Sequence, residues 1–138
     1  MEEFQVNILA ILVAAVAAFA LGALWYSPVL FAKPWMKAHG YTPDKLEAMK
    51  KGMARAYGAS FVCFLAMAAA MAILIHRLGV GSAFGGIKLG GLCWVGFAAT
   101  IGLTANMYSD KPLSTYVIDA GYQLVYMVIM GIILAVWH

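Results

Sequence analysis

The stretch Gly22-Ala-Leu-Trp-Tyr-Ser-Pro28, continued by Lys33-Pro-Trp35, separates a long apolar run from the most basic part of the chain. The run from Val6 to Tyr26 has no charged residue, and its length is close to the ~20 residues that a helix needs to cross ~30 Å of hydrocarbon. Tryptophan and tyrosine gather at membrane–water interfaces, and proline ends or kinks a helix. The stretch therefore predicts the end of a first transmembrane helix at the membrane boundary.

The composition supports a membrane location for the whole chain. It has 138 residues, of which 64% are hydrophobic and 11% charged, and this is too apolar for an ordinary water-soluble domain. The net charge of +3 is modest and gathers in one segment, which suits an anionic membrane surface better than nucleic acid. Cys63 and Cys93 each lie in an apolar run without a neighbouring histidine. We therefore expect a lipid bilayer as partner, no nucleic acid, no cofactor and no metal site.

Apolar runs divide the chain into four expected spans within a single transmembrane domain over residues 1–138. The spans are expected at about 6–26, 57–75, 87–105 and 114–137. Together with a short interfacial helix between the first two spans, they predict an all-α membrane protein.

The polar connection 27–55 contains the expected interfacial helix. Pro28 and Pro34 prevent a regular helix from continuing across them without a kink. The sequence Thr42-Pro-Asp44 is typical of a helix start, with a hydroxyl N-cap, proline at the first position and an acid in the first turn. We expect an amphipathic helix to follow and to lead into the second span.

The basic residues predict the orientation. Seven of the nine lysines and arginines lie in the first and third connections, whereas only Arg77 and Lys88 lie on the opposite side. Because basic residues are enriched in cytoplasmic loops, we expect these two connections in the cytoplasm and both termini outside.

Small residues recur every four positions in two of the expected spans. Ala10, Ala14, Ala18 and Gly22 form one ridge, and Gly86 with Gly90 begins another. Such ridges allow close approach of helix backbones in lipid. They exceed what one compact bundle obviously needs, and so they favour a homo-oligomer.

The fourth span carries the one polar face among the expected spans. Its members share about a third of the helix circumference and are Thr115, Tyr116, Asp119, Tyr122, Gln123 and Tyr126. An ionisable group within a span costs roughly 2.5–3.5 kcal/mol at the bilayer centre, so Asp119 should face protein or water. Arg55 lies at the same expected level and is the predicted partner of Asp119, with Lys111 as the alternative. Further residues expected at this level, which would line a small vestibule, are Trp25, Tyr26, Asn106 and Tyr108.

Three roles for Asp119 stay open from the sequence: a pair that fixes helix packing, a site for an ion, proton or polar ligand, and a contact with lipid headgroups.

Trp25, Tyr26 and Trp35 are most simply interfacial aromatic anchors. His39, His76 and His138 are far apart and form no metal cluster, so a solvated or capping role is expected.

The function follows only in outline. No G-x-S-x-G, H-E-x-x-H or P-loop motif and no paired carboxylates occur, so we do not expect an enzyme. One hypothesis is transport or binding of an ion, a proton or a small molecule through the polar face of the fourth span. The alternative is a non-catalytic structural or accessory membrane subunit that interacts with lipid or with a partner protein.

The stretch Gly22–Pro28 with Lys33–Trp35, here called the boundary stretch, also carries a resemblance to a known family. Three parts of the chain contribute to it: Trp25, Tyr26, Ser27, Pro28, Lys33 and Trp35; the later Gly40-Tyr-Thr42; and the closing run 121–137. In these parts the chain resembles the bacterial membrane family catalogued as domain of unknown function 1761. The resemblance covers nearly the whole chain and implies a small multi-pass protein of the cytoplasmic (inner) membrane. It implies no catalytic residue, because the family's name records no established activity.

Overall fold

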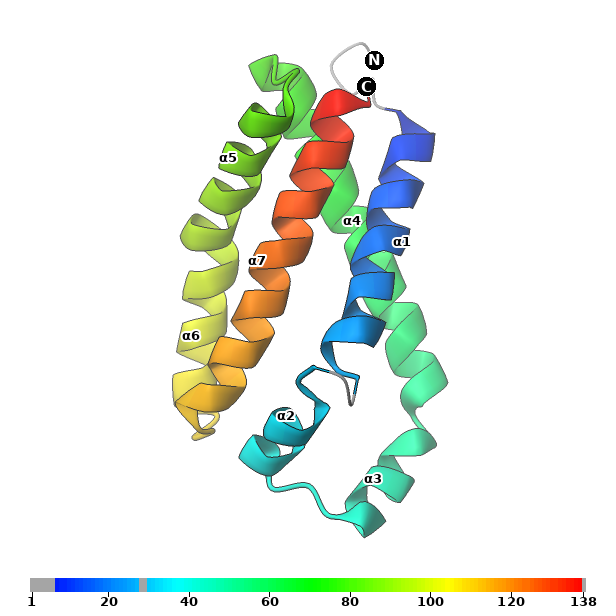
Figure 1. The fold of residues 1–138 in the computed structure, drawn as a ribbon, viewed down its shortest axis with the longest axis vertical. Helices are drawn as coiled ribbons and strands as arrows, with labels where there is room; N and C mark the ends of the chain where they lie inside the picture. Colours follow the sequence, from blue (N-terminus) through cyan, green and yellow to red (C-terminus); the bar gives the residue numbers. More distant parts are fainter. Residues whose placement is uncertain (1–6, 28–29, 138) are drawn as a thin grey trace.

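The structure, a computed structural model, describes residues 7–27 and 30–137. All regular elements of this part are helices (Figure 1). In chain order they are α1 (Ile8–Trp25), α2 (Ala32–His39), α3 (Pro43–Lys50), α4 (Met53–Leu78), α5 (Ala83–Cys93), the π-helix η2 (Trp94–Ala98), α6 (Ala99–Tyr108) and α7 (Leu113–Val136).

Four helices are long and apolar enough to cross a membrane, which confirms an all-α membrane protein. They are Ile8–Trp25, Met53–Leu78, Ala83–Tyr108 and Leu113–Val136, the third being α5, η2 and α6 in continuous succession. The second and third begin about four residues before their expected starts and end about three residues after their expected ends. They extend further because local caps, rather than the limits of the apolar runs, set helix ends: Ser82 caps the start of α5 through Gly85 N–H, and Gly79 ends α4 in the left-handed conformation.

The first connection holds two short helices rather than the one that was expected. Pro34 is the third residue of α2, where its missing N–H removes no intrahelical hydrogen bond. Gly40, with a φ of 70°, ends α2. Thr42 caps α3 as predicted, its hydroxyl accepting from Lys45 N–H at 3.3 Å. Pro28 lies outside the described residues.

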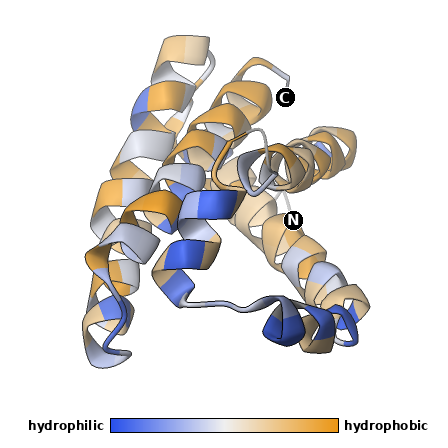
Figure 2. Cartoon of the chain, turned by 60° about the horizontal axis from the view of Figure 1, so that its bottom comes forward, coloured by the Kyte–Doolittle hydropathy of each residue, from blue (hydrophilic) through white to orange (hydrophobic). Residues whose placement is uncertain are grey.

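Hydrophilic residues gather on α2 and α3, whereas the four long helices are mainly apolar on their surfaces (Figure 2). Large apolar side chains face outward along these helices: Ile8 is 71% exposed, and Leu92 and Ile101 are each 68% exposed. In water such a surface would favour aggregation, but in a bilayer it is the surface that contacts lipid.

Helix α7 is the centre of the bundle and packs against α1, α2, α4, α5 and α6. Met130 in the middle of α7 is fully buried. The start of α1, the end of α7 and the α4–α5 turn lie at one end, whereas α2, α3 and the α6–α7 turn lie at the other (Figure 1). The seven basic residues of the first and third connections are thus at one end, and the side of the membrane that this end faces stays a prediction.

The ridges of small residues are buried within one chain. Ala10, Ala14 and Ala18 have at most 1% exposure and lie in the core. On α5, a Cβ added at Gly86 would collide with the backbone of Gly131 in α7. The ridges therefore serve packing inside the chain, and the homo-oligomer that they suggested stays a prediction.

The contact between Gly86 and Gly131 gives a test of this packing. Gly86→Ala should lower the free energy of unfolding by about 1–3 kcal/mol, because the backbones of α5 and α7 must separate. Gly91→Ala on the same helix is the matched control, since a Cβ there meets nothing within 4 Å, and it should be neutral or raise stability by up to about 1 kcal/mol. Thermal unfolding of both variants in detergent measures the difference, and equal melting temperatures would contradict the packing.

Candidate functional site

The carboxylate of Asp119 on α7 is held by two aromatic donors from the boundary stretch. Its Oδ1 accepts hydrogen bonds from the Tyr26 hydroxyl at 2.5 Å and from Trp35 Nε1 at 3.1 Å. Tyr26 directly follows α1, and Trp35 lies in α2. The boundary stretch therefore folds back onto the polar face of α7.

Two further tryptophans fix the backbone of α7 beside Asp119. Trp25 Nε1 donates to the carbonyl of Ile118 at 3.0 Å, and Trp94 Nε1 donates to that of Ala120 at 2.9 Å. Trp94 lies at the start of the π-helix, a local widening that often occurs at functional sites. Gly121 leaves room for the Trp25 ring, whose nearest atom lies 3.2 Å from an added Cβ.

Trp25, Tyr26 and Trp35 thus have a structural role beyond interfacial anchoring, which stays a prediction. Each donates a hydrogen bond to α7, because a buried N–H or hydroxyl needs an acceptor. Elsewhere in the family-like stretch, the Ser27 hydroxyl donates to Leu24 O at 2.6 Å, and the Lys33 side chain is exposed.

The polar face of α7 divides into two parts. Tyr122 donates to the carbonyl of Ala18 at 2.6 Å, and Tyr126 contacts Met67 Sδ at 3.5 Å, so both point into the core toward α1 and α4. The other members of the face, Thr115, Tyr116, Asp119 and Gln123, border a pocket on the side of α7 that faces α6. The expected lining is therefore wrong for Tyr122 and Tyr126, whose hydroxyls are used for packing.

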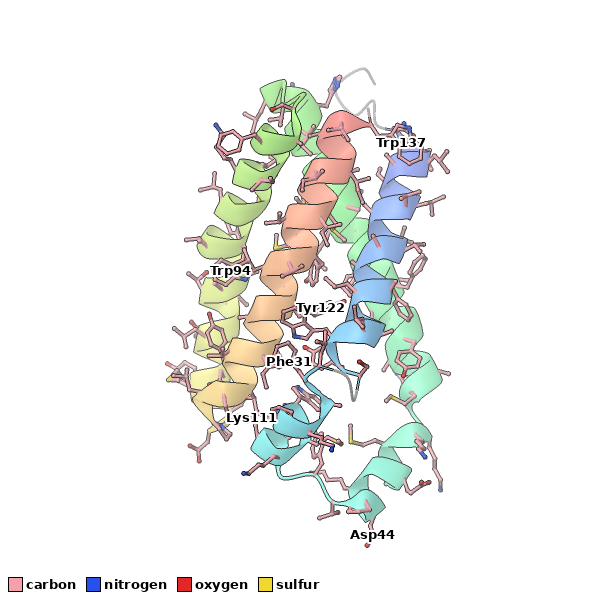
Figure 3. The ribbon with its side chains drawn as sticks, in the orientation of Figure 1. Phe31, Asp44, Trp94, Lys111, Tyr122 and Trp137 are labelled. Atoms are coloured by element: carbon pink, nitrogen blue, oxygen red, sulfur yellow. The ribbon has the colours of Figure 1, made fainter. Side chains whose placement is uncertain are left out.

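The pocket has a volume of about 200 Å³ and lies between α6, α7 and one side chain of α2. Figure 3 shows Lys111 in the turn between α6 and α7, at the end of the bundle where α2 lies. The lining residues are His39, Gly102, Ala105, Asn106, Ser109, Lys111, Thr115, Tyr116, Asp119, Ala120 and Gln123. The structure thus brings together six residues of the expected set: Thr115, Tyr116, Asp119, Gln123, Asn106 and Lys111.

The predicted pair between Asp119 and Arg55 is wrong. Arg55 is exposed at the start of α4 and does not line the pocket. That end of α4 lies on the opposite side of α1 and α2 from α6 (Figures 1 and 2). Among the described residues the ion pair found is Lys50–Glu47, on α3. Tyr108 is also outside the site, with 90% exposure.

Asn106 is the most informative residue of the pocket. It is only 9% exposed, and its Nδ2 donates to Thr115 Oγ1 at 3.1 Å and to Pro112 O at 3.4 Å. Its Oδ1 is buried and has no hydrogen-bond partner among the described residues. A buried polar atom left unpaired costs about 1–3 kcal/mol, so this oxygen has an unused capacity to accept a hydrogen bond.

Sequence reasoning missed two polar residues of the pocket, Ser109 and His39. The His39 ring lies 4.2 Å from that of Trp35 and stacks on Tyr41 at 5.0 Å, measured between centroids, and its Nε2 is buried without a partner among the described residues. Burial, followed by the charge of Lys111, lowers the pKa of His39 and favours a neutral ring. The four-residue spacing of Trp35 and His39 on one helix was the available signal, because such residues share a face.

Ser109, His39 and Asp119 all line this pocket, yet they do not form a catalytic triad. Asp119 Oδ1 accepts from Tyr26 and Trp35, and His39 Nε2 has no hydrogen-bond partner within residues 7–27 and 30–137. Within the described residues, no group of three or more His, Cys, Asp or Glu can hold a metal ion. The arrangement is a set of hydrogen-bonding groups suited to holding a small polar molecule.

Four apolar helices with a polar pocket at one end define a multi-pass integral membrane protein. The chain belongs to the family described as "Protein of unknown function (DUF1761)", whose model matches residues 9–135, and this confirms the resemblance. The matched region includes every residue of the pocket. No curated protein and no solved structure matches the chain.

The hydrogen bond from Tyr26 to Asp119 predicts a stability effect. Tyr26→Phe removes the hydroxyl and should lower the free energy of unfolding by about 1.5–3 kcal/mol, the usual contribution of a bond to a charged group. Tyr108→Phe is the control, because Tyr108 is exposed. Thermal unfolding in detergent compares the two, and an equal effect of both variants would contradict the role of the bond.

The surroundings of His39 predict its titration. Its pKa should lie below the ordinary value of 6.5, and Lys111→Gln should raise it because a nearby positive charge is removed. NMR of the histidine-labelled protein in detergent measures both pKa values. Lys88→Gln, at the opposite end of the bundle, should leave the pKa of His39 unchanged. No response to Lys111→Gln would show that Lys111 does not act on this ring.

Proposed function

We propose that this protein binds a small polar ligand in the pocket between α6, α7 and α2, as a binding protein or carrier rather than as an enzyme. The observation that supports this most strongly is the pocket residue Asn106, whose buried Oδ1 has no hydrogen-bond partner in the described part of the chain. A ligand that donates a hydrogen bond to it removes the cost of leaving the oxygen unpaired.

Packing at the other end of the bundle favours binding over open conduction. There Gly86 and Gly131 bring the backbones of α5 and α7 into contact, and Gly90 packs on the backbone of Met127. An open channel would require these helices to stand apart, so we propose a binding site that is closed at this end and not a permanent channel. We further propose that the protein lies in the cytoplasmic (inner) membrane and that the pocket opens toward the cytoplasm, the side that the basic residues favour.

A second candidate function follows from the bonds to Asp119. Because Tyr26 and Trp35 both donate to this carboxylate, Asp119 also fixes α2 against α7. In a purely structural or accessory subunit this would be its whole role. The pocket would then hold only water.

Ligand-induced stabilisation distinguishes the two functions. We would measure the melting temperature of the full chain in detergent with sodium, potassium and ammonium chlorides, glycine, phosphate and phosphoethanolamine. A ligand present at 100 times its Kd adds about 2.7 kcal/mol of stability. At least one of these compounds should raise the melting temperature of the wild type but not that of Asn106→Leu, which lacks the free acceptor.

Thr104→Val is the matched control on the same helix. It removes a hydroxyl that is exposed outside the pocket and bonds only to Thr100 O, so the response to the ligand should persist. Equal stabilisation of the wild type and Asn106→Leu, or none in the wild type, would support the structural role instead.

A further inference from the structure

The pocket carries two opposite charges at different depths. Asp119 lies one helical turn beyond Thr115 along α7, about 6 Å further from the α6–α7 turn at ~1.5 Å per residue. Lys111 lies in that turn and is exposed. The pocket therefore has a carboxylate in its interior and an ammonium group at its mouth.

The interior is rich in hydrogen-bond acceptors. Asn106 Oδ1 is unpaired, Asp119 is a carboxylate, and the amide of Gln123 lies one turn further along α7. His39 adds a ring whose Nε2 has no hydrogen-bond partner among the described residues. The complementary ligand group is a hydrogen-bond donor with a positive charge, which a protonated primary amine provides.

The mouth of the pocket favours a negatively charged ligand group, because Lys111 lies there. Lys111 forms no ion pair within the described part of the chain, and the exposed Ser109 beside it also lines the pocket. A ligand with only a positive charge would be repelled by Lys111, and one with only a negative charge would be repelled by Asp119. A ligand with both charges satisfies both residues.

We propose that the pocket binds a zwitterion, with its primary ammonium group directed to Asp119 and Asn106 and its phosphate or carboxylate directed to Lys111. This inference rests on the proposed function, since it names the ligand of that site. Two sources share this chemistry, a free zwitterion such as phosphoethanolamine and the headgroup of phosphatidylethanolamine. The pocket lies where the spans end, which is the depth of lipid headgroups.

The free acceptor Asn106 Oδ1 predicts discrimination among headgroups. Phosphatidylethanolamine carries N–H donors, whereas the trimethylammonium group of phosphatidylcholine has the same charge without a donor. Phosphatidylglycerol has hydroxyl donors but no positive charge. Loss of a charge-assisted hydrogen bond corresponds to about tenfold weaker binding or more.

Native mass spectrometry of the full chain with equal amounts of the three lipids tests the proposal, alongside melting temperatures with free phosphoethanolamine or phosphocholine. We expect phosphatidylethanolamine to be retained about tenfold more than either other lipid. Retention should fall about tenfold in Asp119→Asn, which keeps an oxygen acceptor for Tyr26 and Trp35, and several-fold in Lys111→Gln. Lys37→Gln is the control, because it removes the same charge from an exposed position of α2 outside the pocket.

The lipid measurement and the measurement with free compounds together distinguish the two sources of the ligand. Stabilisation by free phosphoethanolamine without lipid selectivity indicates a soluble zwitterion, whereas lipid selectivity indicates a headgroup. Equal retention of all three lipids together with no preference for phosphoethanolamine over phosphocholine would overturn the inference. If sodium or phosphate then stabilised the wild type but not Asn106→Leu, the proposed function would stand and only the zwitterion would be wrong.

Discussion

The hydrogen bonds to Asp119 are the constraint on which the pocket end of the bundle depends. A carboxylate within a span is costly unless it meets protein or water, and here the Tyr26 hydroxyl and Trp35 Nε1 meet it. Tyr26 and Trp35 come from both sides of the turn after α1, so satisfying one carboxylate also positions α2. His39, carried on α2, then becomes part of the pocket wall.

The two roles of α7's polar face follow from helix geometry. At 100° per residue, Thr115, Tyr122 and Tyr126 fall within about 20° of one line, whereas Asp119 and Gln123 lie to one side of it. Tyr122 and Tyr126 meet α1 and α4, whereas Thr115, at the base of α6, lines the pocket together with Asp119 and Gln123. One helix thus supplies both core packing and a polar wall, so a polar face in a span is not by itself a pore lining.

The sequence allowed the spans and the cap of α3 to be predicted but not the partners of Asp119. Apolar length determines a span, and the cap at Thr42 depends on residues within one turn of the helix start. The partner of Asp119 depends on how residues 27–52 fold back, which involves contacts 84 to 93 positions apart. Reasoning from charge selected Arg55, whereas the neutral donors of the boundary stretch satisfy the carboxylate.

The two ends of the bundle are stabilised by different kinds of contact, and this difference determines where a ligand can act. At the end near the termini, Gly86 and Gly131 place backbone against backbone, so no group can enter without separating α5 from α7. At the other end, α2, α6 and α7 are joined by side-chain hydrogen bonds around a cavity that retains an unpaired acceptor. Hydrogen bonds can be exchanged for bonds to a ligand at little net cost, whereas close backbone packing cannot be replaced. The binding that we propose is therefore expected at the pocket end, with the packed end as the rigid support against which the pocket residues are held.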